Sequence, residues 1–210
     1  MARKYRSIAK EGIIALLLST ILFLLVLYPN VPLAMEQLSR QNIGIDRLAE
    51  TGSSKLFSFT DRILESEKPP DWYIEEHIKY ASDFDVWGNF DYWETPDEVV
   101  REGRTDCEGK AVLTKAVYNV LNKRGKLNVT AVIQPQQQHM YVEVRSSGNA
   151  SVALYKLPEK SGLEKTLNGF AAFVNEIPLL RQIILVVGLA GIWARYGLRV
   201  RAAYEKSDRS

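Results

Sequence analysis

Apolar residues are concentrated near the two ends of the chain. Residues 12–35 carry no charge, and their centre (IIALLLSTILFLLVLY) is long enough to cross a bilayer as a helix. Residues 182–194 (QIILVVGLAGIWA) form a shorter uncharged run. Extended to residues 170–196, this run reaches membrane length and then includes Glu176 and Arg181, charges that are costly unless they lie near an interface. The pattern predicts a transmembrane helix over residues 12–35 and a second one over residues 170–196.

Both apolar segments have an alternative interpretation. The first resembles a signal peptide, because Pro32-Leu33-Ala34 weakly resembles a cleavage site. The second could be an amphipathic or buried helix of a folded domain. Lysine and arginine residues are frequent in residues 1–11 and 197–210. Since basic flanks stay on the cytoplasmic side, we expect both termini in the cytoplasm and the middle of the chain outside it.

The middle of the chain changes from helical to strand-like patterns. Residues 36–68 indicate a helical stalk, and residues 69–160 indicate a folded domain. The predicted helices of this domain cover residues 72–84, a short segment after Thr95-Pro96, and residues 105–123. The predicted strands cover residues 128–134, 138–146 and 150–157. Helices followed by an antiparallel sheet make an α+β domain, here flanked by N- and C-terminal transmembrane helices.

Composition narrows the function classes. The 210 residues are 46% hydrophobic and 25% charged, typical of a globular chain, and the net charge of +2 gives no footprint for nucleic acid. Because each basic tail carries a net charge of +3, the segment between them carries −4. One cysteine excludes an internal disulfide and a thiolate zinc site, and two histidines leave little for a metal. We therefore expect no metal and no cofactor.

The single cysteine, Cys107, lies at the predicted start of the longest helix of the domain, directly after the capping residue Asp106. Backbone N–H groups and the helix dipole favour a thiolate there, which is what a nucleophile needs. Asp106 and Glu108 oppose this by raising the pKa of the thiol. The alternative is a half-buried structural cysteine.

A thiolate nucleophile also requires an imidazole, and His139 begins the central predicted strand. His77 lies in a helix next to two glutamates, where a solvated role is expected. On its strand, His139 shares a polar face with Tyr141 and Glu143, which is typical of a cleft lining.

Together these motifs resemble the transglutaminase-like superfamily. Residues 93–100 (WETPDEVV), residues 103–111 (GRTDCEGKA) and the His139 strand have the order and spacing of that family, and the resemblance covers roughly residues 70–157. It implies a papain-like cysteine fold with a Cys–His–Asp triad, in which Cys107 and His139 supply the first two members.

The third member of the triad is missing from its usual position. With a turn at residues 147–148, an antiparallel register places Tyr155, Lys156 or Leu157 opposite His139, and none of them is a carboxylate. The hydroxyl of Tyr155 or the carboxylate of Glu159 could substitute for it.

The resemblance implies a membrane-anchored, extracytoplasmic cysteine enzyme that acts on peptide or carboxamide bonds, by hydrolysis or by acyl transfer. Its expected partners are a protein or peptide substrate and the lipid bilayer. Two alternatives stay open. One is an inactive domain of the same fold that serves as a binding or scaffold module in a membrane complex. The other is a structural two-span membrane protein in which the motif match is accidental.

Overall fold

The computed structural model describes residues 2–136, 139–146, 151–156 and 174–207. The chain divides into two compact units. Unit 1 combines Met1–Pro29 with Ile177–Ser210, and unit 2 comprises Asn30–Glu176. Each unit is described by itself.

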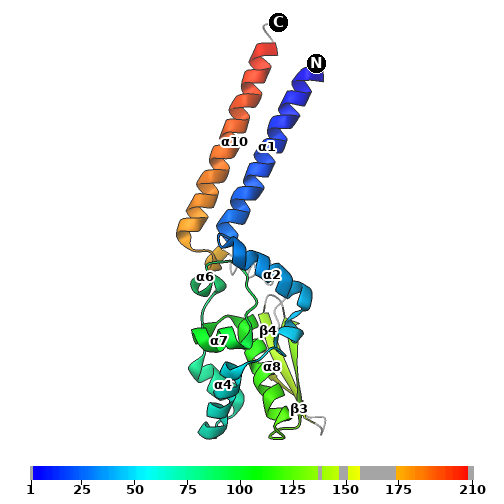
Figure 1. Cartoon of the computed structure of the whole chain (residues 1–210). Helices are drawn as coiled ribbons and strands as arrows, with labels where there is room; N and C mark the ends of the chain where they lie inside the picture. The colour runs from blue at the N-terminus through cyan, green and yellow to red at the C-terminus, as the bar shows by residue number, and fades with distance from the viewer. Residues whose placement is uncertain (1, 137–138, 147–150, 157–173, 208–210) are drawn as a thin grey trace. The chain divides into compact units, whose positions relative to one another are not determined.

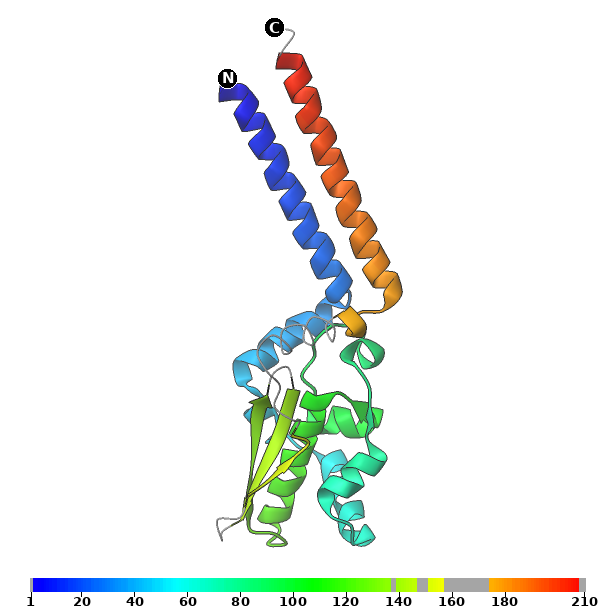
Figure 2. The same ribbon diagram turned by 180° about the vertical axis from the view of Figure 1, so that it is seen from behind.

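Unit 1 is a pair of long helices, α1 (Ala2–Leu27) and α10 (Leu179–Ser207), which lie side by side in Figures 1 and 2. Both helices are long and apolar enough to cross a membrane, over Ile8–Leu27 and Leu179–Glu205. Large apolar side chains such as Leu16 and Val186 are 60% and 66% exposed. An exposed apolar surface of this extent is typical of a membrane contact.

Small residues and charges at defined points hold the two helices of unit 1 together. Gly188 packs so closely on Leu22 that a side chain at this glycine would collide with it. Nη1 of Arg199 donates to both carboxylate oxygens of Glu11, each at 2.7 Å. Arg181, which the sequence presents as a cost within an apolar segment, donates to the carbonyl of Val26 at 3.2 Å. The charge is thus partly satisfied within the unit.

The apolar helices have different boundaries from those expected. The first ends at Leu27 and not at residue 35, because Asn30 caps a new helix, α2 (Val31–Ile43), which has proline in its first turn. The second begins at Leu179, and residues 170–173 of the predicted span lie outside the described residues.

Unit 2 continues from α2 as a series of short helices followed by a sheet. The remaining elements are α3 (Ile45–Leu48), α4 (Ser54–Ser66), α5 (Pro70–His77), β1 (Lys79–Tyr80), α6 (Asp83–Val86), α7 (Pro96–Glu102), β2 (Arg104–Thr105), α8 (Cys107–Lys123), β3 (Val129–Gln136), β4 (His139–Ser146) and β5 (Ser151–Leu154). Strands β3, β4 and β5 form an antiparallel sheet in that order. The α+β class predicted from the sequence is confirmed.

Helix α8 is the centre of unit 2, because both of its faces are buried. One face carries Leu113 and Val117 into a core formed with α4, α5 and α7. The other face carries Val112 against the sheet, where it meets Ile133 and Val142. Val142 is fully buried against α8. Because side chains alternate between the two faces of a strand, the even-numbered residues of β4 face α8.

Residues 36–68 are helical, as expected, but they belong to unit 2 and not to a separate stalk. Leu48 and Ala49 pack against the sheet, and Leu56, Phe59 and Ile63 pack against α8. The reason is the strong apolar face of α4, which needs a partner surface.

The predicted helix over residues 72–84 is wrong in its second half. Helix α5 ends at His77, and the chain then forms the two-residue strand β1, parallel to β2. The Lys79 N–H donates to the Gly103 carbonyl at 3.0 Å, and the Ala81 N–H donates to the Thr105 carbonyl at 2.9 Å. This pairing places the segment before α8 against the loop that leads into α6.

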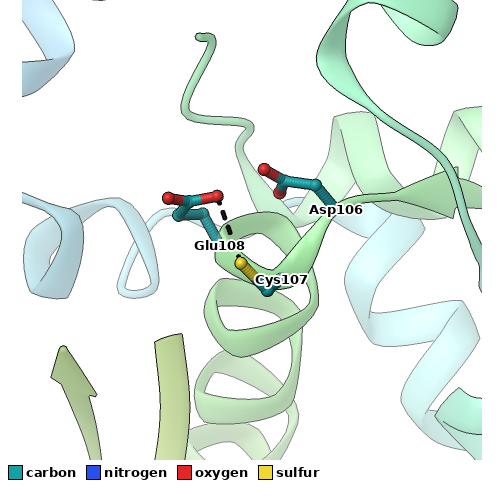
Figure 3. A group of neighbouring side chains, drawn as sticks. All are labelled: Asp106, Cys107 and Glu108. Carbon is teal, nitrogen blue, oxygen red and sulfur yellow. Dashed lines mark hydrogen bonds between the residues drawn. The ribbon is translucent and has the colours of Figure 1, made fainter. Parts of the chain in front are cut away.

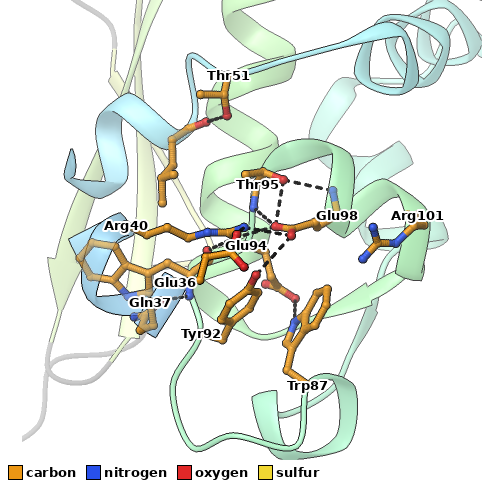
Figure 4. A network of polar contacts seen from close by, with 12 residues as sticks. Glu36, Gln37, Arg40, Thr51, Trp87, Tyr92, Glu94, Thr95, Glu98 and Arg101 are labelled. Carbon is orange, nitrogen blue, oxygen red and sulfur yellow. Dashed lines mark hydrogen bonds and ion pairs between the residues drawn. The ribbon is translucent and has the colours of Figure 1, made fainter. Parts of the chain in front are cut away.

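The start of α7 joins α2 to the rest of unit 2 through a buried polar network, shown in Figure 4. Thr95 and Glu98 form a reciprocal capping box. Arg40 of α2 donates to Glu98 Oε2 and to the Trp93 carbonyl, each at 2.6 Å, and also pairs with Glu36. Burial opposes ionisation of Glu98, but its bonds with Arg40 and Thr95 hold its pKa below the ordinary value. Here a half-buried carboxylate has a buried cation as partner.

Candidate active site

Cys107 is the first residue of α8, as predicted. Asp106 caps the helix, with its Oδ1 accepting the Gly109 N–H at 3.1 Å. The Cys107 sulfur is partly buried and donates to Glu108 Oε2 at 3.5 Å, and the carboxylate of Asp106 lies beside it (Figure 3). A further contact comes from the backbone N–H of Met140.

This environment opposes thiolate formation. Burial raises the pKa of the Cys107 thiol well above its ordinary value, and the negative charges of Glu108 and Asp106 raise it further. A hydrogen bond from the Met140 N–H acts in the other direction but does not outweigh them. The direction agrees with the expectation that the two flanking acids raise the pKa of this thiol.

His139 is the first residue of β4, directly before the residue whose N–H faces the sulfur. The fold therefore brings the start of β4 to the start of α8. The Nε2 atom of His139 lies 2.6 Å from the backbone carbonyl oxygen of Tyr155. Between described residues, the Cys107 sulfur and the imidazole share no hydrogen bond, and the Met140 side chain, not the imidazole, packs on the α8-facing cluster.

The two candidate orienting groups differ from what the sequence suggested. The hydroxyl of Tyr155 lies 3.5 Å from the carbonyl oxygen of Asp71, so the contact with His139 comes from its backbone and not from its hydroxyl. Glu159 lies outside the described residues.

Two further carboxyl groups, those of Asp83 and Glu94, lie at the start of α8. Ligand atoms of Asp83, Glu94 and Asp106 lie within 4.8 Å of one another, and Asp106 also belongs to a second group with Cys107 and Glu108. Within the described part of the chain, no ion pair reaches any of these carboxylates. This cluster of four acidic residues, the α8 carboxylate cluster, consists of Asp83, Glu94, Asp106 and Glu108.

Burial without a cation raises the pKa of these acids. The pKa of Asp83 rises to about 10 because of burial and the charges of Asp106 and Glu94. Its Oδ2 accepts the Tyr92 N–H at 2.7 Å, while its Oδ1 is buried and has no partner among the described residues. The pKa of Glu94 rises to about 7, again mainly because of burial. These groups therefore carry protons under conditions where exposed carboxyls are ionised.

Glu94 is also fixed in position by its neighbours. Trp87 Nε1 donates to Glu94 Oε1 at 2.8 Å (Figure 4), and the Thr105 hydroxyl donates to Glu94 Oε2. Gly109 of α8 lies against both Glu94 and Thr105, and a Cβ at this position would collide with them. The first turn of α8 is thus packed directly on the carboxylate cluster.

The cluster bears on the expectation that the protein binds no metal. That expectation considered cysteine and histidine ligands, whereas the groups in the structure offer mainly carboxylate oxygens. Oxygen donors suit hard cations such as Ca²⁺ or Mg²⁺. Shared protons satisfy closely spaced carboxyl groups as well.

His77 lies on the exposed surface of α5, as expected. Its Nδ1 lies 2.8 Å from the Tyr73 carbonyl oxygen, and its ring stacks on Tyr73. It therefore has a local structural role on α5.

Sequence reasoning missed Asp83 and Glu94 as parts of the site. Glu94 falls within the motif at residues 93–100, but nothing in its spacing indicates burial. Asp83 comes from a loop and a one-turn helix that only the pairing of β1 with β2 brings to α8.

The chain matches no protein-family model, and a comparison with curated proteins finds no match either.

Proposed function

We propose that this chain is a membrane-anchored cysteine enzyme of the transglutaminase-like type, in which Cys107 and His139 act on a peptide or carboxamide bond. The observation that carries the proposal is that the first residues of helix α8 and of strand β4 lie next to each other. The sulfur at the first turn of α8 contacts the Met140 N–H, and the preceding residue is the histidine that begins β4. Thiol acyl transfer needs a base that reaches the nucleophilic sulfur, and the proposal assigns this role to His139 because the start of β4 lies at the end of α8 that carries Cys107.

The reaction follows from the roles of these groups. The imidazole takes the thiol proton as the sulfur forms a bond to the carbonyl carbon. The C–N bond then breaks, the imidazole returns the proton to the leaving amine, and a thioester remains on Cys107. Water or a second amine attacks the thioester, which restores the thiol and releases an acid or a new amide. In this proposal the backbone N–H of Cys107 supplies part of the oxyanion hole.

A second function is favoured by the electrostatics of the site. Burial and the flanking acids raise the pKa of the Cys107 thiol, and the His139 ring binds the Tyr155 carbonyl. A domain in which the thiol stays protonated would serve as a binding or scaffold module. The two functions differ in one respect: only the enzyme needs His139 to activate Cys107.

The chain itself offers a matched experiment. Since Cys107 is the only cysteine, iodoacetamide labelling of the full chain in detergent micelles reports on this thiol alone. His139→Gln is compared with His77→Gln, which removes the other histidine. The enzyme predicts that His139→Gln slows alkylation at pH 7 by about 100-fold, within the range for a lost general base, and that His77→Gln has no effect. Equal rates in all three proteins, rising only at high pH, would support the binding module instead.

The proposal also includes an orientation in the membrane. The basic residues that follow the apolar core of α10 and precede that of α1 support cytoplasmic termini, with unit 2 outside the cytoplasm. The test uses Cys107→Ala chains that carry a single new cysteine, either Ser7→Cys or Lys126→Cys. A membrane-impermeant maleimide should label Lys126→Cys on intact cells and Ser7→Cys only after permeabilisation. The reverse result would contradict this orientation.

A further inference from the structure

The chain leaves the sheet after β5 through a left-handed turn. The register between β4 and β5 runs as far as Val142 and Leu154, and the next residue, Tyr155, has a φ of +67°. A left-handed conformation at a residue other than glycine is strained and persists only where surrounding contacts hold it. Tyr155 therefore needs such contacts.

The ring of Tyr155 supplies these contacts. Its hydroxyl lies 3.5 Å from the Asp71 carbonyl oxygen of α5. Its ring centroid lies 5.7 Å from the ammonium nitrogen of Lys110, which pairs with Glu75 at 2.8 Å. Burial raises the pKa of Tyr155 to about 12, so the phenol stays neutral. Residues of α5 and of α8, the helix that Cys107 begins, thus anchor the side chain.

The consequence of the turn is the direction of the Tyr155 carbonyl. Its oxygen lies 2.6 Å from His139 Nε2. A carbonyl oxygen only accepts, so the hydrogen of this bond must be on Nε2. A neutral imidazole has one N–H, which leaves Nδ1 as the proton acceptor of the ring.

We propose that the backbone carbonyl of Tyr155 replaces the missing carboxylate of the triad, fixing the tautomer of His139 with the hydrogen on Nε2 and Nδ1 as the base. A carboxylate that orients a histidine selects a tautomer and adds a negative charge. The Tyr155 carbonyl selects the tautomer as well, but it adds only a dipole in place of the negative charge. Tyr155 is therefore a positioning residue, and the use of Nδ1 as a base toward Cys107 rests on the proposed function.

The tautomer can be measured directly in the intact protein. The full chain in micelles is labelled with ¹⁵N-histidine, and long-range ¹H–¹⁵N correlation spectra are recorded over a pH series until the rings are neutral. The chain has two histidines, and His77→Gln assigns the signals. His77 is an internal control of opposite sign, because its Nδ1 faces the Tyr73 carbonyl at 2.8 Å. We expect His139 as the Nε2–H form and His77 as the Nδ1–H form. An Nδ1–H form or a mixture of tautomers at His139 would overturn the proposal.

Two substitutions test whether the left-handed turn at Tyr155 fixes the tautomer of His139. Tyr155→Asn and Tyr155→Ile both remove the ring, but asparagine tolerates the left-handed region and a β-branched residue does not. We expect His139 to keep a single tautomer in Tyr155→Asn and to become a mixture in Tyr155→Ile. An unchanged single tautomer in Tyr155→Ile would show that the carbonyl is not the orienting group.

The outcome for the enzyme is separate. A single Nε2–H tautomer at His139, combined with alkylation of Cys107 that ignores His139→Gln, would support the positioning role of Tyr155 and refute the proposed activity.

Discussion

Two helices of unit 2, α7 and α8, begin in the same way but in opposite electrostatic environments. Each has a polar cap, Thr95 or Asp106, and each first turn has carboxyl groups beside it that are at least partly buried. At α7 the acid Glu98 is paired with the buried Arg40 at 2.6 Å. At α8 no cation from the described residues reaches Asp83, Glu94, Asp106 or Glu108.

The difference appears in the proton affinities of the two sites. The pKa of Glu98 is lowered, whereas the pKa values of Asp83 and Glu94 are raised to about 10 and about 7. The first arrangement is that of a structural ion pair. The second holds buried acids in their protonated form, at pH values where exposed carboxyls are ionised, next to the only thiol of the chain. Groups with perturbed pKa values are concentrated at functional sites.

The largest effect is expected from removing the cation at α7. Arg40→Met leaves the half-buried Glu98 without its partner, and we expect a cost of about 3 kcal/mol in the free energy of unfolding, the lower end of the range for a buried pair. Urea unfolding of the full chain in micelles, followed by tryptophan fluorescence, measures this cost. Arg47→Met is the control, because Arg47 is exposed on α3, and its effect should stay within about 0.5 kcal/mol. Similar costs for the two variants would show that the ion pair at the start of α7 does not stabilise the fold, contrary to the comparison with α8.

The next effect tests how tightly α8 packs on its carboxylates. Glycine to alanine in an open helix position stabilises by up to about 1 kcal/mol. At Gly109 the new Cβ collides with Glu94 and Thr105, so we expect Gly109→Ala to destabilise unit 2 by about 1–3 kcal/mol. Asn119→Ala on the same helix is the control and should change stability only slightly. A stabilising Gly109→Ala would show that the contact is loose.

The carboxylate cluster at α8 also predicts a pH dependence. The folded-state pKa of Asp83 is about 10 and that of Glu94 about 7, both above their ordinary values of 3.8 and 4.5. The folded state therefore binds more protons than the unfolded state, and stability falls as pH rises. We expect the melting temperature of the full chain to be lower at pH 9 than at pH 5.

The substitution Asp83→Asn isolates one part of this dependence. Asparagine keeps an acceptor for the Tyr92 N–H and cannot ionise, so the fall between pH 5 and pH 9 should become smaller. Since one unit of displaced pKa corresponds to about 1.4 kcal/mol, the change should be measurable. A melting temperature that falls equally in both proteins would exclude Asp83 as a source.

The smallest effect concerns one hydrogen bond. Thr105 is fully buried, and its hydroxyl donates to Glu94 Oε2. Thr105→Val preserves the shape and removes the donor, for a loss of about 1 kcal/mol. The bond favours the ionised form of Glu94. Its loss should therefore raise the pKa of Glu94 further and extend the fall of stability to higher pH. A variant as stable as the parent at every pH would indicate that Glu94 does not depend on this bond.

Local signals were sufficient to predict several elements. The cap Thr95 with Pro96, the cap Asp106, and the periodicity of α8 specify two helices, and alternating residues specify β3 and β4. These features depend on neighbours within one turn or one strand, which a sequence displays directly.

Long-range packing determined what could not be predicted. The helix expected to reach residue 84 ends at His77 because β1 pairs with β2, about 25 residues away. Residues of the expected stalk, such as Phe59, are buried by α8. Asp83 and Glu94 lie near Cys107 because of long-range contacts such as the pairing of β1 with β2, so no local sequence pattern predicts this cluster.

The central claim is that Cys107 and His139 act as a pair in acyl transfer. It is tested most directly with p-nitrophenyl acetate, which acylates a reactive thiol and releases a coloured product. The full chain in micelles should give a burst of one p-nitrophenolate per chain and then slower turnover as the thioester is hydrolysed. The burst should disappear in Cys107→Ala, should slow greatly without turnover in His139→Gln, and should be unchanged in His77→Gln. A protein that shows no burst above the Cys107→Ala background, or a burst that His139→Gln leaves intact, would contradict the account.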